Sequence, residues 1–371
     1  MSSRFHSCNG MQPDISGQRA RPDGSPVDVA VHPDWHRVRG CRDIRISAPY
    51  RRVGRGGPPR RLHHPVTAGD ARTHGIDRID GAGCRRGWPV ACCRLFTDGS
   101  EKMRRIASGD LYQTYDLGDL RITSLRDGYV DMPIGRLRQR GDKPFGDELP
   151  QQVALVAGQL RLSVNAFAID DGNGIILIDT GASNAWHPTM GRLPEALDEA
   201  GIDAGRVRTV CFTHTHLDHI HGLVLADGRD AFPRLTRLLV PAEELGFFRA
   251  EARLERFHGM AEPFEAGDRI GTHVDIVDAH GHEAGHSCFR VSSGGERVLI
   301  WGDTVHVPSL QFDRPEVTWE FDADQDQARE SRLRLLALAA DEHCFVAGAH
   351  LDSPGIGRVV RSGASFQFEP L

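Results

Sequence analysis

The sequence has no run of 18 or more apolar residues, and its first residues lack the apolar segment of a secretory signal. Because a bilayer span needs about 20 apolar residues, we expect no membrane-spanning helix and no membrane partner. Lysine occurs only as Lys102 and Lys143 while arginine is abundant, a bias that indicates a GC-rich genome more than a function.

Cysteine is sparse beyond residue 100, where only Cys211, Cys288 and Cys344 occur, each in an apolar run. Wide spacing and apolar surroundings are typical of buried free thiols in a reducing compartment. We therefore expect a cytoplasmic protein.

The first hundred of the 371 residues differ in composition from the rest. They contain seventeen Arg, nine Asp and five of the eight Cys but no Lys or Glu, whereas acidic residues outnumber basic ones from Glu101 onward. Three interpretations are open: an Arg-rich arm for nucleic acid or anionic surfaces, a disordered extension, and a misassigned start site. We favour the last, because Met103 opens folded-looking sequence and Glu101-Lys102 has purine-only codons, as a ribosome-binding site would. We expect residues 1–102 to be a disordered or misassigned extension and residues 103–371 to form the folded domain.

Three imidazoles and a carboxylate are concentrated in one short segment after an apolar, strand-like run over residues 207–212. They are His214, His216, Asp218 and His219. These side chains suit borderline divalent metals such as zinc and are poor at filling a core. Residues two apart on an extended segment point the same way, so His214 and His216 can hold one ion, while Asp218 and His219 face a second position.

Further candidates lie downstream. Residues 281–286 read Gly-His-Glu-Ala-Gly-His, Asp303 ends the apolar run 298–302, and His350 ends the run 344–349. A polar residue at the tip of a buried strand is where α/β proteins place their chemistry. These positions therefore join the candidate metal ligands.

Together these segments resemble the metallo-β-lactamase superfamily, which has an HxHxDH loop, a Gly-His-x-x-Gly-His segment, a Gly-Asp at a strand end and a final lone His in this order. The resemblance implies two divalent ions, zinc foremost, although manganese, iron and cobalt share the ligand set. It implies one ion on His214, His216 and His282, a second on Asp218, His219 and His350, and Asp303 as the bridge. It also implies that Asp179 braces the metal loop.

Residues 311–315, 321–324 and 350–357 resemble more narrowly the subgroup that contains methyl parathion hydrolase and related lactonases. This implies a hydrolase in which a hydroxide between two metal ions cleaves an ester, lactone or phosphotriester bond of a small molecule, with Asp218 or Asp303 accepting the proton. Two alternatives stay open: a persulfide dioxygenase with one iron ion, and a metal-binding protein without turnover. Nucleic acid is not expected as a partner, and a homodimer is open.

Some residues near His282 depart from the family pattern. Glu283 stands where the family usually has Thr or Ser. We expect it to point to solvent; the alternative is that it lies beside the metal ligands and softens the Lewis acidity of the metal. We expect His286 to pack beside the site and His280 not to be a ligand. Five aromatic residues either line an apolar substrate pocket or simply pack in the core: Trp186, Phe247, Phe248, Phe257 and Trp319.

The resemblance implies an α/β fold, an αββα sandwich of two mixed sheets with helices on both outer faces. Periodicity and turn residues predict strands over 120–125, 160–170, 174–179, 207–212, 273–278, 287–292, 297–301, 345–347 and 367–368. They predict helices over 193–200, 242–258 and 324–341, the last with an Asp at its start.

Overall fold

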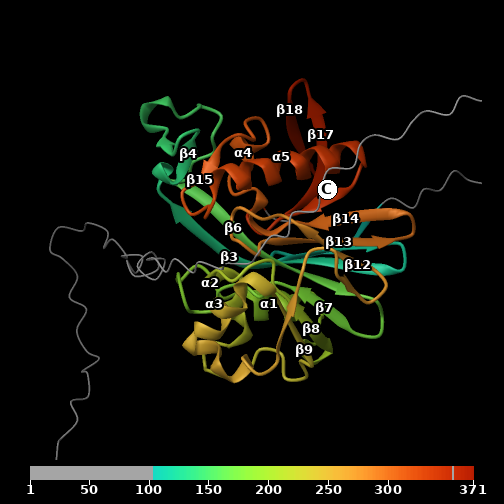
Figure 1. Cartoon of the computed structure of the whole chain (residues 1–371). Helices are drawn as coiled ribbons and strands as arrows, with labels where there is room; N and C mark the ends of the chain where they lie inside the picture. The colour runs from blue at the N-terminus through green and yellow to red at the C-terminus, as the bar shows by residue number, and fades with distance from the viewer. Residues whose placement is uncertain (1–102, 353–354) are drawn as a thin grey trace, which may run out of the picture. The chain divides into compact units, whose positions relative to one another are not determined.

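The computed structural model describes residues 103–352 and 355–371. The expectation for residues 1–102 lies outside the described residues. In the described part, the strands form two large sheets and one small one (Figure 1).

The first sheet has eight strands in the order β1-β2-β3-β6-β7-β8-β9-β10. Neighbours from β1 to β7 are antiparallel, and those from β7 to β10 are parallel. The strands are β1 (Arg104–Ser108), β2 (Tyr112–Leu117), β3 (Leu120–Met132), β6 (Leu160–Asp170), β7 (Ile175–Ile178), β8 (Val207–Cys211), β9 (Arg237–Pro241) and β10 (Ala261–Phe264).

The second sheet has seven strands in the order β11-β12-β13-β14-β16-β17-β18. Strands β14 and β16 are parallel, and the other neighbours are antiparallel. The strands are β11 (Arg269–Ile270), β12 (Val274–Asp278), β13 (Ser287–Ser293), β14 (Glu296–Ile300), β16 (Phe345–Ala347), β17 (Ile356–Ser362) and β18 (Ser365–Pro370). The small sheet pairs β15 (Thr318–Trp319), β4 (Leu137–Gln139) and β5 (Lys143–Pro144).

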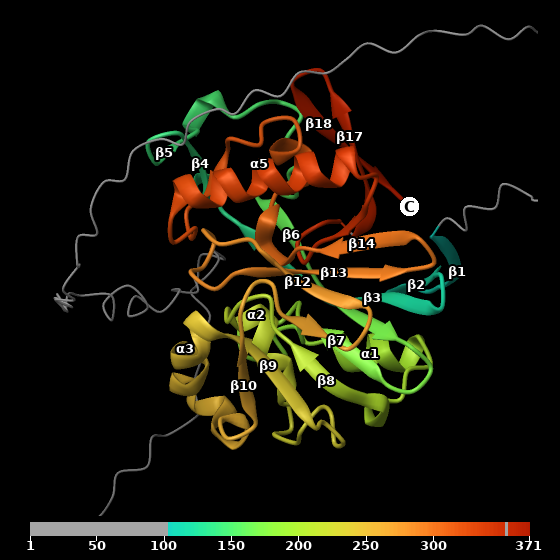
Figure 2. The ribbon, with the colours of Figure 1, turned by 45° about the vertical axis from the view of Figure 1, so that its right-hand side comes forward.

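The helices cover the outer faces of the two large sheets (Figure 2). They are α1 (Leu193–Glu199), α2 (Leu217–Ile220), α3 (Leu245–Ala250), α4 (Pro308–Gln311) and α5 (Gln325–Asp341). Helix α1 packs on β2 and β3, where Leu193 and Leu197 join Leu125 in one apolar cluster. Helix α5 packs on β17, where Leu335 and Leu336 join Val359 in another. The predicted αββα sandwich is therefore confirmed.

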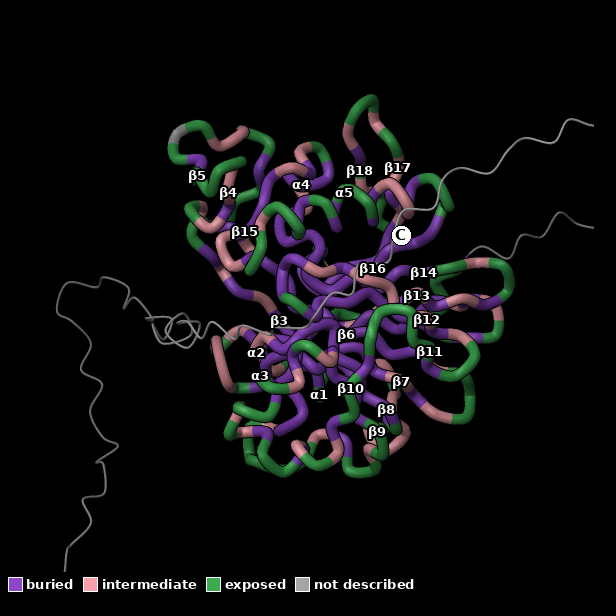
Figure 3. The backbone as a smooth tube through the Cα atoms, viewed as in Figure 1, coloured by how far each residue is buried: buried purple, intermediate pink, exposed green. Residues whose placement is uncertain are grey.

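The central core lies between the two sheets, where the tube in Figure 3 is mostly buried. Ile122 and Phe167 of the first sheet share one apolar cluster with Phe289 and Ile300 of the second. Each strand turns alternate side chains to this core, so burying both inner faces removes much apolar surface from water. Rigid strand ends on both sheets then carry the loops of the site.

Most of the predicted elements are present, and one helix is wrong. The predicted helix over 242–258 is divided into η6 (Ala242–Glu244), α3 and η7 (Ala252–Phe257). The break falls at Glu251, whose backbone is extended (φ −79°, ψ 102°) and whose carboxylate accepts the N–H of Arg253. The predicted Asp at the start of α5 is confirmed, because Asp324 accepts the backbone N–H groups of two residues in the first turn.

No helix within residues 103–352 and 355–371 is long and apolar enough to cross a bilayer.

Candidate metal centre

The histidine-rich loop, residues 213–219, follows the carboxyl end of β8 in the first sheet. His216 precedes α2, and Asp218 and His219 lie in the first turn of that short helix. Asp303 follows β14 in the turn η8 (Gly302–Thr304), and His350 follows β16. Since β14 and β16 are parallel, their carboxyl ends deliver both residues to the same edge.

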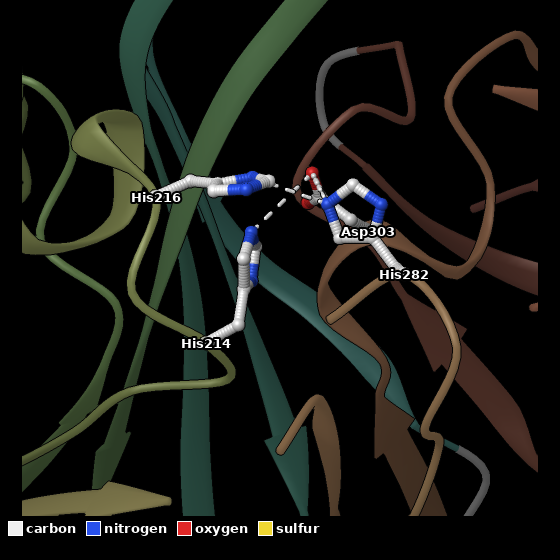
Figure 4. Close-up of side chains that lie close together, drawn as sticks. All are labelled: His214, His216, His282 and Asp303. Carbon is white, nitrogen blue, oxygen red and sulfur yellow. Dashed lines mark hydrogen bonds and ion pairs between the residues drawn. The ribbon is translucent and has the colours of Figure 1, made fainter. Parts of the chain in front are cut away.

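The structure brings all seven predicted ligand residues together, in two groups of side chains that could each hold a metal ion. The first group is His214, His216, His282 and Asp303, and the second is Asp218, His219 and His350. Figure 4 shows the three imidazoles of the first group converging on the carboxylate of Asp303. This division is the one that the spacing of the loop predicts.

Asp303 lies between the two groups. Its Oδ2 is 3.4 Å from Nε2 of His282 and 3.8 Å from Nε2 of His214, both in the first group. The same oxygen is 2.9 Å from Nε2 of His350, and Oδ1 is 3.2 Å from Nε2 of His219, both in the second group. One carboxylate therefore faces both candidate metal positions.

Three of these inward-facing atoms are buried without a hydrogen bond of suitable geometry among the described residues: Nε2 of His214, Nε2 of His219 and Oδ1 of Asp303. The last two lie 3.2 Å apart, as an ion pair. A buried polar atom left unpaired costs free energy, so such atoms need an explanation. Imidazole nitrogens and carboxylate oxygens are the donors that zinc and related divalent ions accept. The side chains present therefore fit two such ions.

The opposite ring nitrogens of the histidines are held by the protein. Nδ1 of His219 lies 2.8 Å from Asp179, Nδ1 of His282 lies 2.8 Å from Asp322, and Nδ1 of His350 lies 2.7 Å from the carbonyl oxygen of Ser163. Each acceptor takes the Nδ1–H, so Nε2 is the nitrogen that faces the centre, where a bound cation would displace any proton that it carries.

Asp179 braces the histidine-rich loop, as predicted. Its carboxylate accepts the backbone N–H of Thr213 at 2.8 Å and the Thr213 hydroxyl at 2.9 Å. Because that hydroxyl donates to Asp179, its oxygen can accept the Nδ1–H of His214, 3.1 Å away. A single carboxylate thus orients both His214 and His219.

The environment of Glu283 differs from the prediction. We expected its side chain in solvent, but it is buried, and Oε1 lies 3.0 Å from Nε2 of His216. The loop after β12 folds back, since the N–H of Gly281 bonds to the carbonyl oxygen of Glu283. This tight turn directs Glu283 inward beside His282.

The two neighbouring histidines behave as predicted. Nδ1 of His286 donates to the carbonyl oxygen of Ala279, and Nε2 accepts the backbone N–H of Asp303 at 3.1 Å. Burial lowers the pKa of His286 to about 3, so its ring stays neutral and supports Asp303 from behind. His280 is half-buried beside Asp278 and belongs to neither ligand group.

Sequence reasoning missed His306, which lies three residues beyond Asp303. The ring is buried between Trp319 and His350, with centroid distances of 5.0 and 5.2 Å, and its Nε2 is 3.3 Å from Oδ2 of Asp303. The only signal was its spacing, because residues three apart in a turn share one face. Burial lowers its pKa to about 4, so the ring is neutral near pH 7.

The charged groups of the centre lie close together. Burial by itself lowers the pKa of His282, but hydrogen bonds to Asp303 and Asp322 outweigh burial and raise it to about 10. Burial also opposes the charge on His219, yet the carboxylates of Asp303, Asp218 and Asp179 raise its pKa well above the usual value. Asp303 has a pKa well below its usual range, because the surrounding histidines outweigh the effect of burial.

The predicted aromatic residues mostly pack in the core. Phe248 and Phe257 are buried against the first sheet, and Trp319 is buried beside His306. Trp186 is partly buried against an apolar cluster next to the small sheet, and Phe247 is exposed. Ordinary packing therefore accounts for Phe248 and Phe257.

Two packed mixed sheets, with a histidine and aspartate cluster at their strand ends, define a class of metal-binding α/β proteins. The chain belongs to the metallo-beta-lactamase superfamily, whose family model matches residues 160–350. A hydrolase named AbOPH, in the beta-lactamase superfamily, has a similar structure: 28% identity, a TM-score of 0.64, and 71% of this chain matched to 99% of that one.

Two further likenesses are more distant. AidC, a dizinc quorum-quenching lactonase, shares the fold at 22% identity with a TM-score of 0.61, over 70% of this chain and 97% of its own. A probable metallo-hydrolase of Mycobacterium tuberculosis is 24% identical over 225 residues, which are 48% of this chain and 71% of that protein.

Proposed function

We propose that this protein is a binuclear metal-dependent hydrolase that cleaves an ester, lactone or phosphotriester bond in a small molecule. The observation that carries the proposal is the position of Asp303 between the two groups of ligand atoms. The likeness to the hydrolase AbOPH supports hydrolysis as the type of reaction. In this proposal His214, His216 and His282 hold one ion, Asp218, His219 and His350 hold the other, and Asp303 bridges them.

The chemistry divides between the ions and the protein. When bound, two divalent ions supply positive charge at the scissile bond and lower the pKa of water from 15.7 to about 7. Asp218 and Asp303 offset part of that charge, whereas neutral imidazoles offset none, so the centre keeps a net positive charge for a developing oxyanion. Asp303 has a low pKa and stays ionised, which suits a carboxylate that lies between two cations. Asp218 or Asp303 is the proposed proton acceptor.

The test begins with elemental analysis of the full-length protein purified without chelator. Two zinc-like ions per chain are expected. An aryl phosphotriester, a γ-lactone and a carboxylate ester are then offered as substrates, the lactone because the lactonase AidC shares the fold. If none of the three substrates is hydrolysed, the proposed bond classes are wrong.

Two matched variants test the site itself. His216→Ala removes a proposed ligand, so the variant should bind one ion fewer per chain and lose most of its turnover. His280→Ala removes an imidazole close to the same loop, outside both ligand groups, and should keep both ions. Full activity in His216→Ala would overturn the assignment, and a single iron per chain would favour an oxygen-activating enzyme instead.

A further inference from the structure

His216 has a buried carboxylate against one edge of its ring and the metal ligands against the other. Oε1 of Glu283 lies 3.0 Å from Nε2 of His216, and Nε2 of His282 lies 3.2 Å from Nδ1 of the same ring. Glu283 directly follows His282 in the chain, so two consecutive residues of one loop contact opposite edges of one imidazole. Glu283 is only 7% exposed.

The contact selects one of the two neutral forms of His216. A neutral imidazole carries a single N–H, and an ionised carboxylate can only accept a hydrogen bond. The form with N–H on Nε2 donates to Glu283 and turns the lone pair of Nδ1 toward His282 and the metal position. In the other form, the lone pair of Nε2 would face the lone pairs of the Glu283 carboxylate, and the N–H on Nδ1 would point at the cation.

Glu283 completes a pattern that the other ligand histidines share. His214, His219, His282 and His350 each have a protein group at the ring nitrogen that faces away from the centre. His216 is the most exposed of the proposed ligand histidines, with 30% of its side chain accessible. Without Glu283, Nε2 of His216 would lose this contact, and the ring would be held less firmly.

A second glutamate joins the same two loops. Glu244 accepts the backbone N–H of Thr215, next to His216, and the backbone N–H of Gly285, two residues beyond Glu283. The backbones on both sides of the His216–Glu283 contact are therefore tied to one buried side chain. This geometry keeps the contact in register and limits the freedom of the ring.

We propose that Glu283 is a positioning residue of the metal centre, which holds His216 with Nδ1 directed at the ion shared with His214 and His282. The inference rests on the proposed function, because it needs that ion. A hydrogen-bonded partner of a metal-binding histidine changes metal affinity by about 10–100-fold. Loss of Glu283 should therefore weaken the binding of the ion at His214, His216 and His282. The affinity for the ion at Asp218, His219 and His350 should not change.

The test compares wild type, Glu283→Gln, Glu283→Ala and a control, Glu255→Ala, which removes an exposed glutamate. The full-length proteins are stripped of metal, checked for folding by circular dichroism, and titrated with Zn²⁺ against a competing chelator. Wild type and control should bind two ions. Glu283→Ala should bind one ion with unchanged affinity and the other about 10–100-fold more weakly. Glu283→Gln should stay near wild type, since its amide oxygen can still accept from Nε2.

A second readout needs no metal. Nitrogen-15 NMR of the stripped protein should place the His216 proton on Nε2 in wild type and distribute it over both nitrogens in Glu283→Ala. Unchanged zinc affinity or an unchanged proton position in Glu283→Ala would overturn the inference. Equal losses in Glu283→Gln and Glu283→Ala would also overturn it, because charge rather than the hydrogen bond would then be responsible. If wild type binds no zinc, the proposed function fails, while the proton position still tests the contact.

Discussion

Glu244 accepts the backbone N–H of Thr215 at 2.7 Å, at the residue that separates His214 from His216. The same carboxylate accepts the Thr215 hydroxyl at 2.8 Å and the backbone N–H of Gly285 at 3.1 Å. Glu244 is fully buried, and burial raises its pKa. One side chain thus fastens two ligand-bearing loops that lie about seventy residues apart in the chain.

Replacing Glu244 by Ala should destabilise the protein and weaken metal binding together. Two buried N–H groups lose their acceptor, at a cost of about 1–3 kcal/mol each. Urea unfolding of the stripped protein measures the change, with the exposed neighbour Glu243→Ala as the control. If the two variants unfold at the same urea concentration, the fastening role of Glu244 is wrong.

Asp322→Ala should lower zinc affinity by about 10–100-fold, because His282 loses the acceptor of its Nδ1–H. Asp322→Asn keeps an acceptor oxygen and should lose less. Competition with a chelator measures both, and Asp313→Ala, at an exposed position, serves as the control. Wild-type affinity in Asp322→Ala would show that His282 is oriented by other contacts.

Gly302→Ala should displace Asp303. Gly302 has φ +53°, and an added Cβ would lie 2.7 Å from Nε2 of His286 and 2.8 Å from Oγ1 of Thr213. Gly295→Ala is a matched control, because Gly295 has φ +83° but nothing within 4 Å of an added Cβ. Both variants carry backbone strain of about 1–3 kcal/mol, but only Gly302→Ala should also reduce zinc affinity. Thermal unfolding and zinc titration separate the two effects, and equal zinc affinity would contradict this account.

Zinc binding should release protons, and zinc affinity should rise with pH between about 6 and 9. His282 has a pKa of about 10 in the metal-free protein, and the pKa of His219 is also raised, so both rings carry protons that a cation must displace. His286 and His306, with pKa values of about 3 and 4, hold no extra proton to release. Calorimetry in two buffers of different ionisation enthalpy counts the protons. Identical heats in both buffers would show that no proton is released.

The same pKa predicts how the metal-free protein responds to alkali. The pKa of His282 is raised from 6.5 in the unfolded chain to about 10. Its contribution to stability is therefore complete below about pH 6.5 and is lost as the pH rises through about 10. The melting temperature of the stripped protein should fall over this range, and a flat profile would contradict the prediction.

Much of the fold could be predicted from the sequence because its strands alternate apolar and polar residues and end at turn residues. The strand over 160–170 is such a case. The helix after Asp324 could be predicted from the Asp at its start. The segment 242–258 could not be predicted, because its apolar residues repeat at helical spacing although the backbone opens at Glu251. Periodicity reports which face is buried, and it does not report a local break in the hydrogen-bond ladder.

The candidate ligands could be predicted from the family pattern, and their role in holding metal stays a prediction. The residues that orient them could not be predicted in the same way. Nothing in the sequence assigned this role to Glu244, Asp322 or His306, and tertiary packing brings each one to the centre. The burial of Glu283 also depends on how its loop folds back, which composition does not reveal.

The two large sheets are consecutive in the chain: strands of the first end at Phe264, and strands of the second begin at Arg269. During synthesis the first sheet can therefore pair completely while His282, Asp303 and His350 are still missing. The nascent chain passes through a stage in which the HxHxDH loop is present without its counterparts. The last proposed ligand, His350, follows β16, so the proposed centre would be completed only late in synthesis.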